Sequence, residues 1–484
     1  MAVRPAQVQV ALARRTLTPF GLWVFGAAAS APMVVLVGGI PATYATTGVT
    51  ALPLTFVLVA GTVAALAVGY TAMARQVGHP AAYYGILAHG LGRAWGVAAG
   101  MVALVAYNAI QISLYGLFGA TLAGQLGGAW WVWSAAAVAA VGVLGVRAIV
   151  LSTRVLAAVL AVSLLVVVVF VVAGVGRPAD AGVSWAGFDA SGLMVSGIGG
   201  AVAFCVAAFM GVDAPGSFVE EAVDRRAIGR ATIAGVVVLG GMYAMVAWAM
   251  GVAVGPAAVA EHAAGLPFSV LERAGGGWVA TAGVVLVFAI VTSMLAFHSV
   301  VARYVFAMAR EGVLPAGLAQ TGSGTRVSAP RGGSLTQTAV AAVVVFAFAA
   351  AGRDPIAVMF TWLSTLGAMG LLCLLLAASA AALAAPARTR GEQAGVWEWR
   401  LAPALGVLGG SVVLVAMVGN AGSLLGAAPG SAYPFLLPAI LAGTAVVGGM
   451  WAGHLRQYRP EVYAGIGRGT PATHAVPDAI NVSI

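Results

Sequence analysis

The sequence contains 484 residues, of which 61% are hydrophobic and only 8% are charged, whereas about a quarter of the residues of a typical soluble protein are charged. This composition excludes a soluble globular domain and predicts an all-α integral membrane protein. The net charge is +9, and all 23 basic residues are arginine. Their distribution along the chain indicates a lipid bilayer as the partner and no nucleic acid.

Hydrophobic stretches long enough to cross a membrane follow one another along the chain. About twelve of them lie near the ~20 residues that a membrane-spanning helix requires. The predicted spans are residues 20–44, 49–75, 93–124, 130–149, 152–175, 194–220, 228–254, 278–308, 335–352, 355–385, 402–426 and 434–455. One membrane domain therefore occupies almost the entire sequence.

The arginines predict the orientation. With the N-terminus inside, only Arg177, Arg273 and Arg353 fall on the outer side. Because cytoplasmic loops carry an excess of basic residues, we expect both termini in the cytoplasm, with residues 1–19 as an arm and residues 456–484 as a tail. The abundance of Ala, Gly and Arg without Lys indicates a high-GC bacterial source, so we expect a multi-pass protein of the bacterial plasma membrane.

The first span is interrupted in its middle, where the sequence from Gly26 to Pro41 reads GAAASAPMVVLVGGIP. Pro32 has no N–H to donate to the preceding turn, and Gly26 weakens the helix before it. Within lipid, a freed backbone group must find a partner in protein or in a water-filled cavity. The pattern is typical of a broken transport helix, whose backbone groups serve a substrate.

The stretch from the second span into the third carries two further features. Residues 78–93 mix small, aromatic and His residues, which favours a short interfacial or re-entrant element over a solvated loop. In the third span, Asn108, Gln111 and Tyr115 share one helical face. They could look into a common cavity, or they could only hydrogen-bond neighbouring helices.

A second interruption lies in the predicted sixth span, where Phe209 to Pro215 reads FMGVDAP. Asp213 is the only carboxylate that we place within the hydrocarbon, and an acid at that depth is a functional candidate. It could carry a coupling proton, hold a substrate amine, or cap a second half-helix. The charged run from Glu220 to Arg230 follows, either as a solvated loop or as part of an inner gate.

Together the two interruptions predict a site for a zwitterion. The helix that starts near Ser30–Met33 offers free N–H groups to an α-carboxylate, and the helix that ends near Ala208–Met210 offers free carbonyls to an α-ammonium. Phe204 or Phe209 could close over the substrate or only pack. The predicted substrate-binding residues are Ala28, Ala29, Ser30, Ala31, Pro32, Asn108, Gln111, Phe204, Ala208, Phe209, Met210 and Gly211.

The eighth span offers a second way to couple transport to an ion. Thr292 and Ser293 could bind Na⁺ together with carbonyls of the first span. His298 titrates near neutrality when unperturbed, but a helix–helix hydrogen bond is the simpler interpretation. Cys205 and Cys373 lie within spans and indicate neither a disulfide nor a metal site, so we expect no cofactor beyond a coupling H⁺ or Na⁺.

Interruptions in spans one and six imply a five-span repeat, and because five is odd, consecutive repeats have opposite orientation. Residues 20–177 and 194–385 would then form two inverted repeats, and residues 402–455 two peripheral helices.

Several stretches resemble amino acid permeases of the amino acid–polyamine–organocation superfamily: GAAASAPMVVLVGGIPATYATTG, FMGVDAPGSFVEEAVDRRAIGRAT, FHSVVARYVFAMAREGVLP and RPEVYAGIGRG. The resemblance implies a LeuT-like 5+5 inverted repeat with discontinuous helices 1 and 6. By resemblance, Ala28 to Pro32 receive the substrate carboxylate, and Asp213 occupies a position where members carry an acid. Ser163 stands where some proton-coupled members have Lys.

These features predict a secondary active transporter that moves a small molecule, an amino acid, by proton- or sodium-coupled symport. A polyamine or organic amine transporter and an amino acid exchanger remain alternatives.

A major-facilitator transporter would place its D-R-x-G-R-like loop after the second span, whereas here Asp224 to Arg230 follows the sixth. A membrane enzyme would need a metal cluster or a nucleophile–base pair, which the six His, two Cys and one buried acid do not assemble. A channel would fit broken helices, but a single pore acid argues against it.

Overall fold

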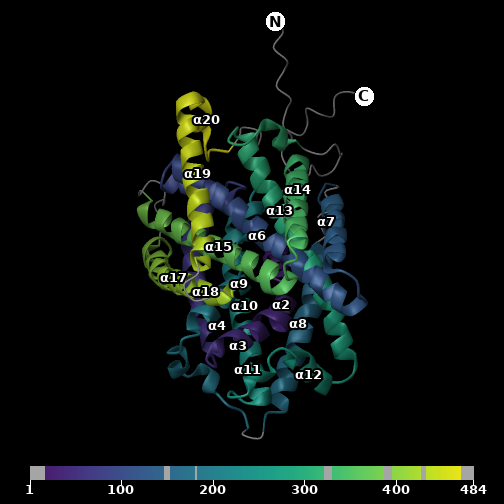
Figure 1. Ribbon diagram of the computed structural model, residues 1–484. Helices are drawn as coiled ribbons and strands as arrows, with labels where there is room; N and C mark the ends of the chain where they lie inside the picture. Colours follow the sequence, from purple (N-terminus) through teal and green to yellow (C-terminus); the bar gives the residue numbers. More distant parts are fainter. Residues whose placement is uncertain are drawn as a thin grey trace.

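The computed structural model describes residues 17–146, 153–179, 182–320, 330–385, 395–426 and 432–469. Long helices form one bundle, with α20 (Pro460–Gly465) at one end and α11 (Val259–His262) and α12 (Leu266–Arg273) at the other (Figure 1). We call these the α20 end and the α12 end. Most of the predicted N-terminal arm and the last part of the predicted tail lie outside the described residues.

Within the described residues, ten helical segments are long and apolar enough to cross a membrane, which confirms the all-α membrane prediction. Their elements are α1 (Pro19–Ala29) with α2 (Pro32–Val34), η1 (Val35–Gly39) and α3 (Ile40–Thr47); α4 (Leu52–Val77); α6 (Arg93–Leu126); α8 (Thr153–Gly176); α10 (Arg225–Val254); α13 (Gly277–Arg310); α14 (Arg331–Ala350); η6 (Pro355–Phe360) with α15 (Thr361–Ala384); η7 (Trp397–Leu401) with α17 (Ala402–Gly419); and η8 (Tyr433–Phe435) with α19 (Leu436–Tyr458). Two shorter apolar helices, α7 (Trp130–Val146) and α9 (Ile198–Ala208), occupy the predicted fourth and sixth spans.

The first span breaks at Ser30 and Ala31, between α1 and α2. Ala31 has φ 46° and is the one non-glycine residue in the described chain with a positive φ, because the N–H-free ring of Pro32 forces the helix to restart there. The span then continues to Thr47, past the predicted end at residue 44. The π-helical turn η1 accommodates Pro41, since a wider turn needs no hydrogen bond from that residue.

The sixth span is also interrupted. Helix α9 ends at Ala208, a turn follows, and the second half is only the 3-10 helix η4 (Ala214–Phe218). The span is discontinuous as predicted, and its second half takes 3-10 geometry. Gly211 takes a left-handed φ of 100°, and Pro215 and Gly216 then disfavour regular α-helix.

Between α4 and α6 lies the short helix α5 (Ala82–Gly90), as the aromatic composition of residues 78–93 predicted. Its residues Ala82 to Ala88 are all buried. Helices α17 and α19 lie at the outside of the bundle and expose apolar side chains such as Leu408 and Met450, a surface that suits lipid.

Candidate functional site

The two interrupted spans meet inside the bundle. Gly211 packs against the break of the first span so closely that a Cβ atom on Gly211 would lie 2.7 Å from the Cβ of Ala29 and 3.0 Å from the backbone N of Ser30. A Cβ on Gly26 would lie 3.2 Å from the ring of Pro215. The structure therefore brings the predicted pair of interruptions into direct contact.

Several backbone groups of the first break are already paired. The N–H and the hydroxyl of Ser30 both donate to the carbonyl of Gly26, each over 3.1 Å, and the N–H of Ala31 donates to Ala28 over 3.2 Å. The side chain of Ser30 thus caps its own helix and does not point a hydroxyl at a ligand. What the break offers a ligand is the start of the helical segment that runs from Pro32 to Thr47.

The turn in the sixth span leaves two carbonyl oxygens without a hydrogen bond from the loops and turns of the described residues. The N–H groups of Val212 and Ala214 donate to Phe209 and Gly211 over 3.3 and 3.0 Å. Among the described residues, no hydrogen bond outside the helices ends on the carbonyl of Ala208 or Met210. These two oxygens lie at the C-terminal end of α9, where the helix dipole is negative, so they are suited to a cationic group.

Asp213 is buried at 3% exposure and accepts hydrogen bonds from two tyrosines. The hydroxyl of Tyr83 donates to Oδ2 over 2.9 Å, and the hydroxyl of Tyr107 donates to the same oxygen. The hydroxyl of Tyr70 donates to the backbone carbonyl of Asp213 over 3.3 Å. The side chain makes no capping bond to η4, so the arrangement does not support the helix-cap interpretation.

A fourth tyrosine completes the group around this acid. The N–H of Tyr83 donates to the hydroxyl of Tyr304 over 3.1 Å, and the rings of Tyr107 and Tyr304 lie 5.5 Å apart. We call Tyr70, Tyr83, Tyr107 and Tyr304 the tyrosine cluster; they come from α4, α5, α6 and α13. The sequence did not predict this cluster. A buried tyrosine needs a partner for its hydroxyl, but that signal does not identify the partner.

The polar face of the third span was predicted to contribute to the substrate site, but Gln111 on this face bonds residues of α13 and α14. Nε2 of Gln111 donates to the hydroxyl of Tyr115 over 3.0 Å and lies 3.3 Å from Nδ1 of His298. Nε2 of His298 lies 2.7 Å from Oγ of Ser334, and Gln337 donates to Oε1 of Gln111. Gln111 and His298 therefore join α6, α13 and α14 by helix–helix hydrogen bonds, and the bonds of Gln111 do not reach either interruption.

Two other predicted substrate-binding residues, Asn108 and Phe209, already contact neighbouring groups of the bundle. Nδ2 of Asn108 donates to Leu104 on its own helix over 2.7 Å. The ring of Phe209 packs against Phe56 and Tyr243, at 6.5 and 5.9 Å between centroids, so it fills the space between α4 and α10. Phe204 is half-buried. The geometry favours packing over substrate closure for Phe209.

The two hydroxyls of the predicted Na⁺ site, those of Thr292 and Ser293, bond carbonyl groups of different helices. Oγ of Ser293 donates to the carbonyl of Ala29 over 2.6 Å and so ties α13 to the break of the first span. The hydroxyl of Thr292 donates to Ala289 on its own helix over 2.9 Å. Of the two, Ser293 is the one that contacts a carbonyl of the first span in this arrangement.

Ion pairs fasten the segment after Asp213 to α13 at the α20 end. Arg303 donates to Oε1 of Glu221 from Nε over 3.1 Å and from Nη2 over 2.7 Å, and Arg310 donates to Glu220 over 2.7 Å. All four side chains are largely buried. This supports the gate interpretation of these acids over a solvated loop.

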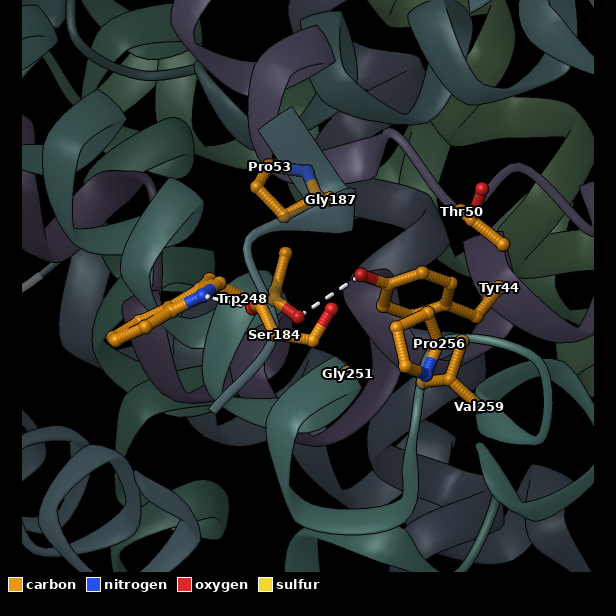
Figure 2. A pocket seen from close by; sticks show the side chains of 10 residues that line it. Tyr44, Thr50, Pro53, Ser184, Gly187, Trp248, Gly251, Pro256 and Val259 are labelled. Carbon is orange, nitrogen blue, oxygen red and sulfur yellow. Dashed lines mark hydrogen bonds between the residues drawn. The ribbon is translucent and has the colours of Figure 1, made fainter. Parts of the chain in front are cut away.

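The α12 end holds a small pocket between α3, α10 and the loop before η2 (Ala186–Phe188), which Figure 2 shows from close by. The hydroxyl of Tyr44 donates to the carbonyl of Ala247 over 2.9 Å, and Nε1 of Trp248 donates to Ser184 over 2.9 Å (Figure 2). The bond between Tyr44 and Ala247 joins α3, in the second half of span one, to α10, which is span seven, and so ties these two spans together at the α12 end.

Comparisons with known proteins agree with this architecture. The profile of a family described as amino acid permease matches residues 20–444, whereas no curated protein matches the sequence. Among 153 matching solved chains is a mutant of the manganese transporter of Eremococcus coleocola. It superposes with a TM-score of 0.55 over 92% of this chain and 95% of its own, at 14% sequence identity. At that identity the likeness concerns the fold.

Proposed function

Because the chain belongs to the amino acid permease family and is therefore a secondary transporter and not an enzyme, we propose that it carries an amino acid across the bacterial plasma membrane by alternating access. The observation that carries the proposal is the contact between the two interruptions, where Gly211 meets Ala29 and Ser30. Two broken helices that meet inside a bundle place N–H groups and carbonyl groups close together, as a zwitterionic substrate requires.

In this proposal the substrate carboxylate binds at the start of the Pro32–Thr47 segment, beside Ala28 to Ala31. The ammonium group binds the carbonyl oxygens of Ala208 and Met210, which accept no hydrogen bond from the loops and turns of the described chain. A substrate that satisfies both ends bridges spans one and six and stabilises the two against each other. A polyamine lacks the carboxylate and would need a free acid, whereas Asp213 already accepts two hydroxyl bonds.

Alternating access requires bonds between a moving group of spans and a scaffold to change. We assign spans 1, 2, 6 and 7 to the moving group and spans 3, 4, 5 and 8 to the scaffold. Contacts that cross that boundary include Ala29 with Ser293, Asp213 with Tyr107, and Glu221 with Arg303. Each breaks or rearranges when the two groups rock past one another.

For the coupling ion we propose a proton carried by Asp213, with Na⁺ at Thr292 and Ser293 as the alternative. A proton on Asp213 removes its charge, which weakens the hydrogen bonds from Tyr83 and Tyr107, and so loosens span six from the scaffold. In the alternative, Na⁺ would take the oxygens of Ser293 and Ala29, which already lie 2.6 Å apart. Amino acid exchange without an ion would leave Asp213 with a structural role.

A metal ion is a different class of substrate, and the solved protein from Eremococcus coleocola is described as a manganese transporter. Within the described part of this chain, no group of three or more His, Cys, Asp or Glu residues could hold a metal ion. Mn²⁺ prefers carboxylate and carbonyl oxygens, and the one acid at the interruptions is already paired with tyrosines. The donor set therefore favours an organic zwitterion.

The test is thermal stabilisation of the purified protein by a panel of amino acids, polyamines, MnCl₂ and unrelated metabolites, with and without Na⁺ and at two pH values. We expect one amino acid to raise the melting temperature, and the effect to disappear in Gly211→Ala. Uptake of that amino acid into proteoliposomes, driven by an imposed proton or sodium gradient, then identifies the ion. Stabilisation by an unrelated solute, with none by an amino acid, would overturn the proposal.

A further inference from the structure

Helix α5 connects two buried carboxylates through neighbouring tyrosines. The hydroxyl of Tyr83 donates to Asp213 over 2.9 Å, and the hydroxyl of Tyr84 donates to Oε2 of Glu311. Both tyrosine side chains are completely buried. Because consecutive residues of an α-helix differ in direction by about 100°, the two side chains leave α5 toward different parts of the bundle while sharing one rigid backbone.

Glu311 lies just after α13 and accepts hydrogen bonds from two other parts of the chain, the start of α5 and the C-terminal segment. Nε2 of His79 lies 3.0 Å from Oε1, and the N–H groups of Gly467 and Gly469 donate to Oε2 and Oε1 over 2.8 Å each. Because an ionised carboxylate only accepts hydrogen bonds, the Nε2–H of His79 donates to Glu311, while Nδ1 lies 3.1 Å from the backbone N of Ala81 and 3.2 Å from its carbonyl oxygen. The carboxylate is therefore a junction between the start of α5, the end of α13 and the C-terminal segment.

The C-terminal segment, residues 463–469, is built to reach this carboxylate. Gly467 and Gly469 have φ values of 77° and 73°, and alternating N–H groups in such a conformation form a concave site for an anion. Ile466 is buried at 2% exposure, and a Cβ on Gly467 would lie 2.6 Å from the Cβ of Ala88 on α5. The segment thus packs on α5 and also bonds the acid that holds Tyr84.

We propose that the C-terminal segment controls the interruption of span six through α5, with Glu311, Tyr84 and Tyr83 as positioning residues for Asp213. Attachment of the segment to Glu311 holds α5 in the place from which Tyr83 reaches Asp213. Detachment frees α5 and releases one of the two hydroxyl donors of that acid. Because coupling between two sites is reciprocal, a change at Asp213 also loosens the C-terminal segment. The role of Asp213 in transport rests on the proposed function; the coupling itself does not.

Hydrogen exchange of the full-length protein in detergent tests the coupling without any substrate. We expect Tyr83→Phe and Asp213→Asn to speed exchange in the peptide that contains Gly467 and Gly469 by about fivefold or more, the lower end of ordinary coupling between sites. Tyr84→Phe is the positive control. Tyr44→Phe removes one buried tyrosine bond at the α12 end and controls for general loosening. Exchange in Tyr83→Phe and Asp213→Asn equal to that in Tyr44→Phe overturns the proposal.

The coupling can also be tested from the C-terminal segment toward the interruption of span six. This test uses a variant at the periphery, so it remains valid where a core variant does not fold. Gly467→Ala cannot adopt the left-handed backbone beside Ala88 without strain, whereas Gly465→Ala meets no atom within 4 Å and is the matched control. We expect Gly467→Ala, and not Gly465→Ala, to speed exchange in the peptide covering residues 209–218 and to lower the maximal uptake rate per folded transporter. Unchanged exchange at residues 209–218 would refute the coupling, whereas absent uptake in the wild type would refute only the transport proposal.

Discussion

The carbonyl oxygen of Ala29 accepts a hydrogen bond of 2.6 Å from Oγ of Ser293, so the break of span one is held directly by α13. In the proposed mechanism this contact crosses the boundary between the moving spans and the scaffold. The Ala29 carbonyl lies within the break, where the helix supplies no ordinary partner. The bond therefore bears on both the stability of the break and the coupling ion.

We expect Ser293→Ala to raise the KM for the transported amino acid severalfold, because the break loses its contact with α13 and a buried carbonyl loses a partner worth about 1–3 kcal/mol. Thr292→Ala is the control, since the hydroxyl of Thr292 bonds only its own helix. Uptake kinetics at several Na⁺ concentrations measure both variants. Loss of the Na⁺ response in both would instead identify the sodium site.

Gly211→Ala should abolish substrate binding. The residue has φ 100°, which costs about 1–2 kcal/mol for an L-amino acid in the left-handed region, and its Cβ would collide with Ala29. Gly241→Ala on α10 meets no atom within 4 Å and should behave like the wild type. Thermal shifts with the substrate test both, and retained binding in Gly211→Ala would remove the contact between the interruptions from the mechanism.

Tyr107→Phe should lower proton-driven uptake about tenfold, because Asp213 loses one of its two hydroxyl donors and a hydrogen bond to a charged group contributes roughly 1.5–3 kcal/mol. Tyr70→Phe removes only a bond of 3.3 Å to the backbone carbonyl of Asp213 and should have a smaller effect. Asp213→Asn should abolish the response to the proton gradient while substrate binding persists. Gradient-driven uptake by Asp213→Asn at the wild-type rate would assign the acid a structural role.

Glu221→Gln should destabilise the closed α20 end. Removing one partner of a buried ion pair costs about 3–5 kcal/mol, and the side chain of Arg303 is only 7% exposed. Arg230→Ala removes an exposed pair with Asp224, which contributes about 0–1 kcal/mol at most, and serves as the control. Melting temperature and hydrogen exchange at residues 216–223 report the difference, and equal effects of the two variants would contradict a buried gate.

The junction at Glu311 should respond to acid. Burial of the carboxyl raises its pKa, but the hydrogen bond and charge of His79, with the bonds from Tyr84 and Gly467, outweigh burial and hold the pKa below its ordinary value of 4.5. A depressed pKa in the folded state stabilises the fold above the unfolded pKa, and this contribution is lost as the pH falls through the folded pKa. We expect the Gly467 and Gly469 amides to stay protected from exchange above about pH 4.5 and to lose protection below it. In Glu311→Gln the protection should be low throughout, and the same acid-induced loss of protection in that variant would contradict the prediction.

Much of this fold could be predicted from local sequence. The lengths of the hydrophobic stretches predict the spans because crossing the bilayer requires about 20 residues. Pro32, Gly211 and Pro215 predict the interruptions because proline cannot donate the helical hydrogen bond and glycine destabilises a helix. The buried acid was identifiable because no charged residue lies between Asp189 and Asp213, so that Asp213 falls inside a long apolar stretch. These are properties of a residue and its immediate neighbours.

What surrounds the acid was decided only by tertiary structure. Tyr83 and Tyr107 lie 130 and 106 residues away from Asp213 in the chain, and no helical periodicity relates residues in different spans. For the same reason Gln111 could be assigned to a polar face but not to its partners on α13 and α14. In the sequence Glu311 resembles an ordinary loop acid. Only the fold places the backbone N–H groups of Gly467 and Gly469 2.8 Å from its carboxylate oxygens. Local chemistry thus determines where this chain breaks and what it buries, whereas the packing of distant helices determines which groups those breaks and buried charges meet.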